Sequence, residues 1–252
     1  MLGSYQGNII MYKFCLVFLI SFGIVGCSSL ELGDAMSSQQ YTQKILDLGL
    51  SHEENLAEAR KLKTPHLISV VSLQLTNARD EKIQNEIDLI ESEKFADKVT
   101  VSGSRYIGSE MSESIKTGVL ETDFDLLNYF LEGVKDSKSG NIQHKLHMTV
   151  SHNSKSKREY LSAHICNQWG RCNATKEDGS NNKLELIAIS TNASNCNSFK
   201  CDYSETIEIP LRDDFLRDYA DKGISLSLIS KKKSHKIKVS KPYLMGYLAV
   251  AI

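Results

Sequence analysis

Residues 142–150, IQHKLHMTV, decide the fold class that the sequence predicts. Ile142, His144, Leu146, Met148 and Val150 fall on one face of an extended strand, which makes that face largely apolar. Further stretches with strand character follow, separated by polar turns: 161–165, 184–189, 203–209, 224–228 and 237–239. Short strands with turns between them predict a mainly β chain, arranged as a β-sandwich that carries a few helices.

Two helices are expected before this β-rich part. Apolar residues from Tyr41 to Leu48 recur at helical spacing, and Gly49 supplies a stop. The segment Ser51-His52-Glu53-Glu54 is a capping box, so a second helix should begin at His52 and end before Thr64-Pro65. The pair is expected to form either a membrane-proximal stalk or a docked helical hairpin.

Other segments carry weaker patterns. Alternation over 67–76 predicts a strand, 77–97 fits a helix or a strand, and 99–101 before Gly103 predicts another strand. The pattern Thr122-x-x-Asp125, followed by an apolar stripe to Val134, predicts a helix. After Pro210 we expect a short helix closed by Gly223, and the final apolar run, 243–252, has the length of a strand.

The N-terminal residues 11–27, MYKFCLVFLISFGIVGC, have the layout of a secretory signal: the cation Lys13, a short apolar core and a small residue at the cut. The ending Ile24-Val25-Gly26-Cys27 resembles the lipobox of bacterial lipoproteins, and this resemblance covers only the N-terminal region. It implies cleavage before Cys27, a diacylglycerol on its sulfur and a fatty acyl chain such as palmitate on its amine. Because Ser28 rather than Asp follows, the resemblance also implies the outer membrane if the source is Gram-negative.

Two alternatives concern this segment. The apolar run could instead remain as an uncleaved anchor helix. Residues 1–10 carry no cation and fit no signal, so Met11 is an alternative start.

These features divide the chain into a signal peptide (1–26), a lipid attachment with tether and helical stalk (27–64), and a β-rich globular domain (65–252). A further division near Ser139 is the alternative. The formal net charge of the chain is −1, and loss of Lys13 with the signal makes the mature protein one unit more negative. This balance gives no electrostatic reason to expect nucleic acid as a partner.

Four cysteines remain for the folded protein: Cys166, Cys172, Cys196 and Cys201. An even number, clustered in an exported chain, predicts two disulfides, and the local pairs Cys166–Cys172 and Cys196–Cys201 are preferred among three connectivities. Zinc is the competing interpretation, because the spacing of the second pair falls within the range of zinc fingers.

No catalytic motif or cofactor motif is found in the sequence, and no catalytic residue, metal ligand or cofactor is assigned. His144, His147, His152 and His164 surround one predicted hairpin, but strand geometry puts His144 and His147 on opposite faces, and a metal site would need His152 and His164 to converge. The chain has no G-x-S-x-G nucleophile turn and no phosphate-binding glycine loop.

Two surface features are candidates for binding. The basic turn Lys231-Lys232-Lys233 is either a solvated hairpin tip or a patch for anionic headgroups. The first cysteine loop holds Trp169, the only tryptophan, together with Arg171, and the second loop holds Phe199 and Lys200. Trp and Arg are enriched at binding hot spots, so we predict these four residues as a partner-binding surface, with both loops at one end of the sandwich. The alternative is that Trp169 folds back as a lid over the sandwich.

The sequence therefore favours a lipid-anchored bacterial envelope lipoprotein with a non-catalytic β-rich binding domain. Its expected partners are the membrane, through the lipid on Cys27, and another envelope protein or an anionic envelope component. A periplasmic hydrolase and a structural spacer of the envelope are the rival classes.

Overall fold

The computed structural model describes residues 36–113, 124–167, 169–175, 181–231 and 233–252. The predicted signal peptide, with its lipobox-like ending at Cys27, lies outside the described residues. The chain divides into two compact units, Met1–Ser72 and Leu73–Ile252.

The first unit contains α1 (Ser38–Leu46), α2 (His52–Ala59) and the beginning of α3 (Pro65–Ala96). The predicted capping box is confirmed: the Ser51 hydroxyl accepts the amide of Glu54, and the Glu54 carboxylate accepts the amide of Ser51 at 2.9 Å. Gly49 follows α1 with a φ of +66°, a backbone conformation that residues with a Cβ rarely adopt. The expected stop at this position is therefore confirmed.

The strand predicted over 67–76 is wrong, because these residues belong to the 32-residue helix α3. Thr64 caps the helix by accepting the amide of Leu67 on its hydroxyl, and Pro65 occupies the first turn, where its missing N–H is not needed. No glycine or proline follows before Gly103, so nothing interrupts the helix once it has begun. The ambiguous segment 77–97 is helical for the same reason.

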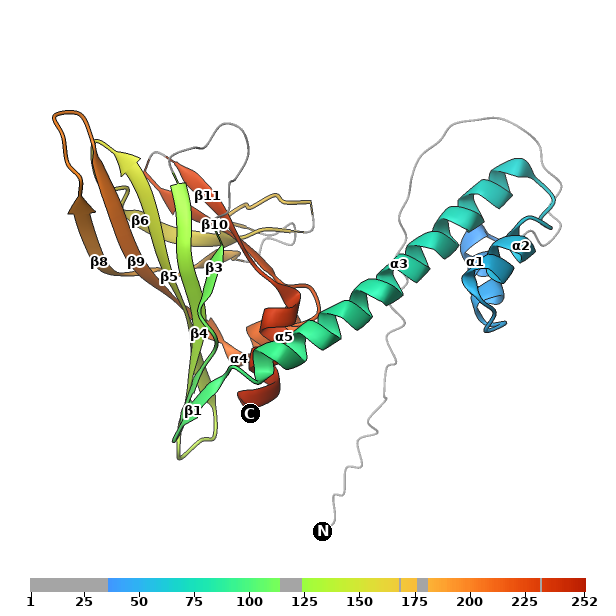
Figure 1. Cartoon of the computed structure of the whole chain (residues 1–252), viewed down its shortest axis with the longest axis horizontal. Coiled ribbons are helices and arrows are strands. Elements are labelled where there is room, and N and C mark those ends of the chain that lie inside the picture. The colour runs from blue at the N-terminus through green and yellow to red at the C-terminus, as the bar shows by residue number, and fades with distance from the viewer. Residues whose placement is uncertain (1–35, 114–123, 168, 176–180, 232) are drawn as a thin grey trace, which may run out of the picture. The chain divides into compact units, whose positions relative to one another are not determined.

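The larger sheet has seven antiparallel strands, all in the second unit. Its order is β1-β2-β4-β5-β9-β8, with β3 also paired to β4 (Figure 1). The strands are β1 (Thr100–Ser102), β2 (Arg105–Ile107), β3 (Met111–Glu113), β4 (Phe124–Lys135), β5 (Ile142–Ser154), β8 (Ile187–Ser194) and β9 (Cys201–Arg212). The predicted alternation in β5 is confirmed, since the five residues of its apolar face are all buried.

The helix predicted from Thr122 to Val134 is wrong. Thr122 lies outside the described residues, and Phe124–Lys135 forms strand β4 between β5 and the short strands β2 and β3. The register shifts between Leu126 and Asn128, so Leu126 and Tyr129 are both buried although they are three positions apart. A bulge in a strand thus imitates the spacing of an amphipathic helix.

The smaller sheet has the order β11-β10-β6-β7 and is also antiparallel. Its strands are β6 (Tyr160–Ile165), β7 (Lys183–Leu184), β10 (Ile224–Ser230) and β11 (Ser234–Val239). The stretches expected to be strands at 224–228 and 237–239 form a hairpin, in which Ile224 pairs with Val239 and Leu226 with Ile237. Both sheets are open, and their buried residues join in one apolar core. The fold is therefore mixed, with N-terminal helices followed by two antiparallel sheets.

Two helices complete the second unit: α4 (Asp213–Asp218) and α5 (Lys241–Val250). The strand expected over 243–252 is wrong, because α5 is helical and buried on almost all sides, which removes the polar face that would have shown its period. It packs closely on α3, since a Cβ on Gly246 would lie 2.3 Å from the carbonyl oxygen of Ser92. The Tyr243 hydroxyl accepts the amide of Leu131 at 2.9 Å, which fixes α5 to β4.

Candidate functional site

Both predicted disulfides are present, as the local pairs Cys166–Cys172 and Cys196–Cys201. Such bonds persist in oxidising compartments, so they suggest an extracytoplasmic location. Among the described residues, no helix is long and apolar enough to cross a membrane.

The two cysteine loops share one local design. The side-chain oxygen of Asn167 accepts the amides of Trp169 and Arg171, each at 3.0 Å. In the second loop, Asn197 accepts the amides of Phe199 at 2.8 Å and Lys200 at 3.0 Å. In both loops an asparagine next to the first cysteine therefore orders a turn that carries an aromatic residue and a cation.

The aromatic residues of these loops point into solvent. Trp169 is 76% exposed and Phe199 is 74% exposed, so the lid interpretation of Trp169 is wrong. The expectation that both loops emerge at one end is also wrong. Figure 1 shows the β8–β9 connection and the segment that follows β6 at separate corners of the unit. The structure therefore presents two separate aromatic tips rather than one joint surface.

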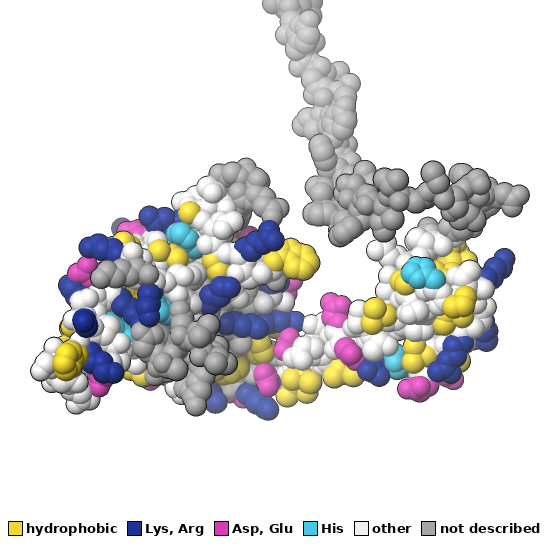
Figure 2. Space-filling view, turned by 90° about the horizontal axis from the view of Figure 1, so that it is seen from above, with side chains coloured by type: hydrophobic (Ala, Val, Ile, Leu, Met, Phe, Trp, Pro, Cys, Tyr) yellow, Lys and Arg dark blue, Asp and Glu magenta, His cyan; other side chains and the backbone are white. Residues whose placement is uncertain are grey.

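A pocket of about 550 Å³ lies between the end of β5, the β5–β6 turn and the β10–β11 turn. Of the residues that the structure describes, five cations line it, together with one carboxylate and four uncharged polar residues. The cations are Lys155, Lys157, Arg158, Lys231 and Lys233; the carboxylate is Glu159; the polar residues are Asn153, Ser154, Ser156 and Ser230. Figure 2 shows many Lys and Arg side chains on this unit. We call the cavity lined by these residues the basic pocket.

Glu159 bridges the two turns of the basic pocket. One carboxylate oxygen lies 3.0 Å from the Lys157 ammonium and the other lies 3.2 Å from the Lys231 ammonium. The hydrogen bonds from Lys157 and then Lys231 hold the pKa of Glu159 below its usual value. Its φ of +55° lies in the left-handed region, which a residue with a long side chain seldom occupies. Such backbone conformations are concentrated at functional sites.

Beneath the β5–β6 turn lies the buried carboxylate of Glu205, on β9. It accepts the backbone amide of Arg158 at 2.8 Å and faces Nε2 of His152 at 2.7 Å. Burial acts to raise the pKa of Glu205, but the hydrogen bonds from His152 and from the turn outweigh it and leave the pKa lowered. An ionised carboxylate inside the protein therefore fixes the backbone of the turn.

The Arg158 side chain joins the two sheets at this site. Its guanidinium donates to Nε2 of the buried His235 at 2.6 Å, and Nδ1 of that ring lies 3.1 Å from the Tyr160 hydroxyl. A guanidinium can only donate hydrogen bonds, so Nε2 of His235 must carry no proton in order to accept this bond. The arrangement holds the β10–β11 hairpin against the β5–β6 turn.

Ser154, His152 and Glu205 form a chain that resembles a hydrolase triad. Nδ1 of His152 lies 3.1 Å from the Ser154 hydroxyl, and its other nitrogen faces Glu205. However, the Ser154 hydroxyl donates to the carbonyl of Ser156 at 2.5 Å. Its proton is therefore directed away from the imidazole. A general base needs the opposite arrangement, so this geometry favours a structural role.

The other predicted histidines have separate surroundings. His144 is buried between Tyr247 and Asp213, His147 faces Glu132 and Glu208, and His164 belongs to the smaller sheet. His152 belongs to the larger sheet, so the two histidines considered for a metal site come from different sheets. Among the residues that the structure describes, no three His, Cys, Asp or Glu side chains are grouped to hold a metal ion.

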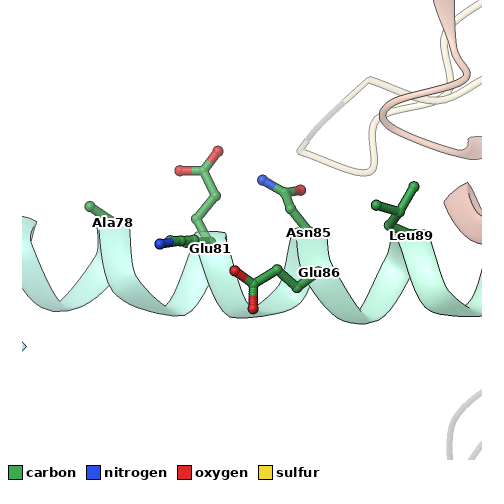
Figure 3. Close-up of a pocket in the computed structure, with 6 residues that line it drawn as sticks. Ala78, Glu81, Asn85, Glu86 and Leu89 are labelled. Atoms are coloured by element: carbon green, nitrogen blue, oxygen red, sulfur yellow. The ribbon is translucent and has the colours of Figure 1, made fainter.

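A second hollow, of about 410 Å³, lies along α3 (Figure 3). The described residues that line it all belong to this one helix: Ala78, Glu81, Lys82, Asn85, Glu86 and Leu89. Figure 3 shows the labelled side chains standing along the helix without converging on a common point. The basic pocket is the stronger candidate, because three segments from two sheets contribute to it.

Sequence reasoning identified the basic turn at 231–233 but missed its partners. In the sequence, Lys155, Lys157 and Arg158 belong to a polar connection between two predicted strands, and Glu205 belongs to a predicted strand. A dense run of cations in 155–158 was the one available indication. The pairing of the two turns depends on contacts between distant strands.

The chain matches no protein-family model, no curated protein and no solved structure.

Proposed function

We propose that this chain is a lipid-anchored bacterial envelope protein whose β-rich unit is a non-catalytic binding module, with the basic pocket as the site for an anionic envelope component. The observation that carries the proposal is the convergence of five cations from two turns around one cavity. Like charges gathered in this way repel one another, and a bound anion relieves that repulsion. The N-terminal lipobox supports the anchor, and the disulfides support an extracytoplasmic site.

Binding of inorganic pyrophosphate to the mature, detergent-solubilised protein tests this function by calorimetry. The double variant Lys231→Glu/Lys233→Glu should weaken binding about tenfold or more, because two cations that line the cavity become anions. Lys183→Glu is the control for one such charge reversal, since Lys183 is exposed on β7 and does not line the pocket. Equal affinities in wild type and both variants, or no binding by the wild type, would remove the basis of the proposal.

The two cysteine loops supply a second contact surface in this proposal. Trp169, Arg171, Phe199 and Lys200 project an aromatic ring and a cation from each of two stiffened turns, a combination that suits apolar burial together with an acidic group. Because the loops lie apart, we propose that they act as two contacts on one extended partner. The partner is the anionic envelope component or an envelope protein.

A lipid-anchored hydrolase is the second candidate, because Ser154, His152 and Glu205 lie in a chain beside the basic pocket. Ser154→Ala decides between the two functions. A binding module should turn over p-nitrophenyl esters in neither the wild type nor this variant. A hydrolase should lose turnover of p-nitrophenyl esters in the variant while the wild type shows it.

A further inference from the structure

We propose that Glu159 occupies the anion subsite of the basic pocket as an internal competitor, and that the ligand is a phosphate monoester whose phosphate displaces the Glu159 carboxylate. This inference rests on the proposed anion-binding function and names the ligand class and the residue that tunes its affinity.

The position of the carboxylate marks the subsite. Its two oxygens contact one lysine from each turn, Lys157 and Lys231, at 3.0 and 3.2 Å. Among the residues described as lining the pocket, Glu159 is the one acidic side chain, beside five cationic residues. A carboxylate between two ammonium groups therefore stands where an anionic group of a ligand would receive the same contacts.

The backbone and the side chain of Glu159 are held by different groups. Its left-handed conformation is fixed from below, where the buried Glu205 accepts the neighbouring amide of Arg158. The Glu159 side chain is 41% exposed and is tied by pairs to lysines that are 55% and 68% exposed. Exposed ion pairs of this kind are individually weak. The carboxylate can therefore leave the subsite while the turn keeps its conformation.

The charge and shape of the subsite favour a phosphate monoester over a carboxylate. A phosphate monoester carries a charge between −1.5 and −2 at neutral pH and offers three strong acceptor oxygens. When Glu159 swings out, the lining of the pocket keeps its five cations, so a dianion with three acceptors satisfies more of them than a second carboxylate. A free phosphorylated metabolite and a phosphorylated lipid headgroup share this chemistry.

Calorimetry with glycerol 3-phosphate as the probe tests the inference in the mature protein. Glu159→Gln removes the competing charge and should tighten binding about threefold or more, whereas Lys231→Ala should weaken it. Glu159→Gly is the second variant, because glycine adopts the observed φ without strain. Both Glu159 variants should bind more tightly by a similar factor, and their melting temperatures should confirm that they are folded.

The outcomes separate this inference from the function on which it rests. Unchanged or weaker binding by both folded Glu159 variants, with wild-type binding intact, would overturn the competitor role and leave the anion-binding function standing. If the wild type and both variants bind neither glycerol 3-phosphate nor pyrophosphate, both proposals are rejected. Vesicles that contain phosphatidic acid, compared with vesicles that contain phosphatidylglycerol, identify the source. If Glu159→Gln also tightens binding to phosphatidic acid vesicles, but not to phosphatidylglycerol vesicles, the ligand is a headgroup monoester. If Glu159→Gln tightens binding of glycerol 3-phosphate but of neither kind of vesicle, the ligand is a soluble metabolite.

Discussion

The Tyr247 hydroxyl lies 2.9 Å from Nδ1 of His144, and this contact links the last helix to the middle of the larger sheet. The other ring nitrogen of His144 lies 3.0 Å from the Asp213 carboxylate on α4, which is also paired with Arg217. The network assigns the proton to Nε2, so that Nδ1 accepts from the tyrosine. Both ring nitrogens of His144 therefore have hydrogen-bond partners, although this residue is buried.

Tyr247→Phe should lower the free energy of unfolding by about 1–3 kcal/mol, because it leaves the buried Nδ1 of His144 without a donor. Urea denaturation measures the change. Tyr219→Phe, on the half-buried residue that caps α4, is the control and should change stability by about 0.5 kcal/mol or less. Equal effects of the two substitutions would contradict the role assigned to the His144 contact.

The stability of the protein should fall as the pH drops below 6.5. Burial lowers the pKa of the His144 imidazole from its usual value of 6.5, and Asp213 offsets this effect only in part. The unfolded chain therefore takes up a proton at His144 near pH 6.5, whereas the folded chain does so only at lower pH, and the free energy of unfolding decreases across that window.

Carboxylates with lowered pKa values, such as Glu205, lose their stabilising charge at still lower pH, because their usual pKa is 4.5. Thermal denaturation between pH 7.5 and 5.5 isolates the histidine contribution. His144→Gln should be less stable overall but should show a flatter dependence on pH in this range. A pH dependence as steep as that of the wild type would assign the effect to another group.

Cys27→Ala should block lipidation and leave a larger precursor that still carries its signal peptide. The reason is that, in the proposed lipoprotein, this thiol is the attachment point for the diacylglycerol. Labelling with radioactive palmitate and the mobility of the protein on gels provide the measurement, with Cys15→Ala as the matched control within the signal. Efficient maturation of Cys27→Ala would refute the proposed anchor.

Trp169→Ala should change the free energy of unfolding by about 0.5 kcal/mol or less, since the side chain is mostly in solvent. Partner contact is checked by placing a photoreactive phenylalanine analogue at position 169 or 199 in intact cells. Discrete crosslinks are expected from both positions. Leu161, which is 56% exposed on β6, is the control position and should give none. Crosslinks from position 161 alone would exclude the loops as the contact surface.

Local rules explain what the sequence determined by itself. The alternation in β5, the capping box at Ser51, the two strands of the β10–β11 hairpin and the two cysteine pairs all depend on neighbours that are close along the chain. The secretory pattern of residues 11–27 is likewise a local feature, and it leads to the proposal of a lipid anchor. Each of these patterns reports a physical preference of a short segment.

Only the tertiary structure decided the rest, because distant segments changed the meaning of local patterns. A bulge at Leu127 made β4 resemble a helix, and burial on almost all sides concealed the helical period of α5. The basic pocket arises because Glu205 and His235, far apart in the sequence, fix the β5–β6 turn opposite the lysines of the β10–β11 turn. Buried polar groups must find partners wherever the fold brings them, and this requirement set the geometry of the site.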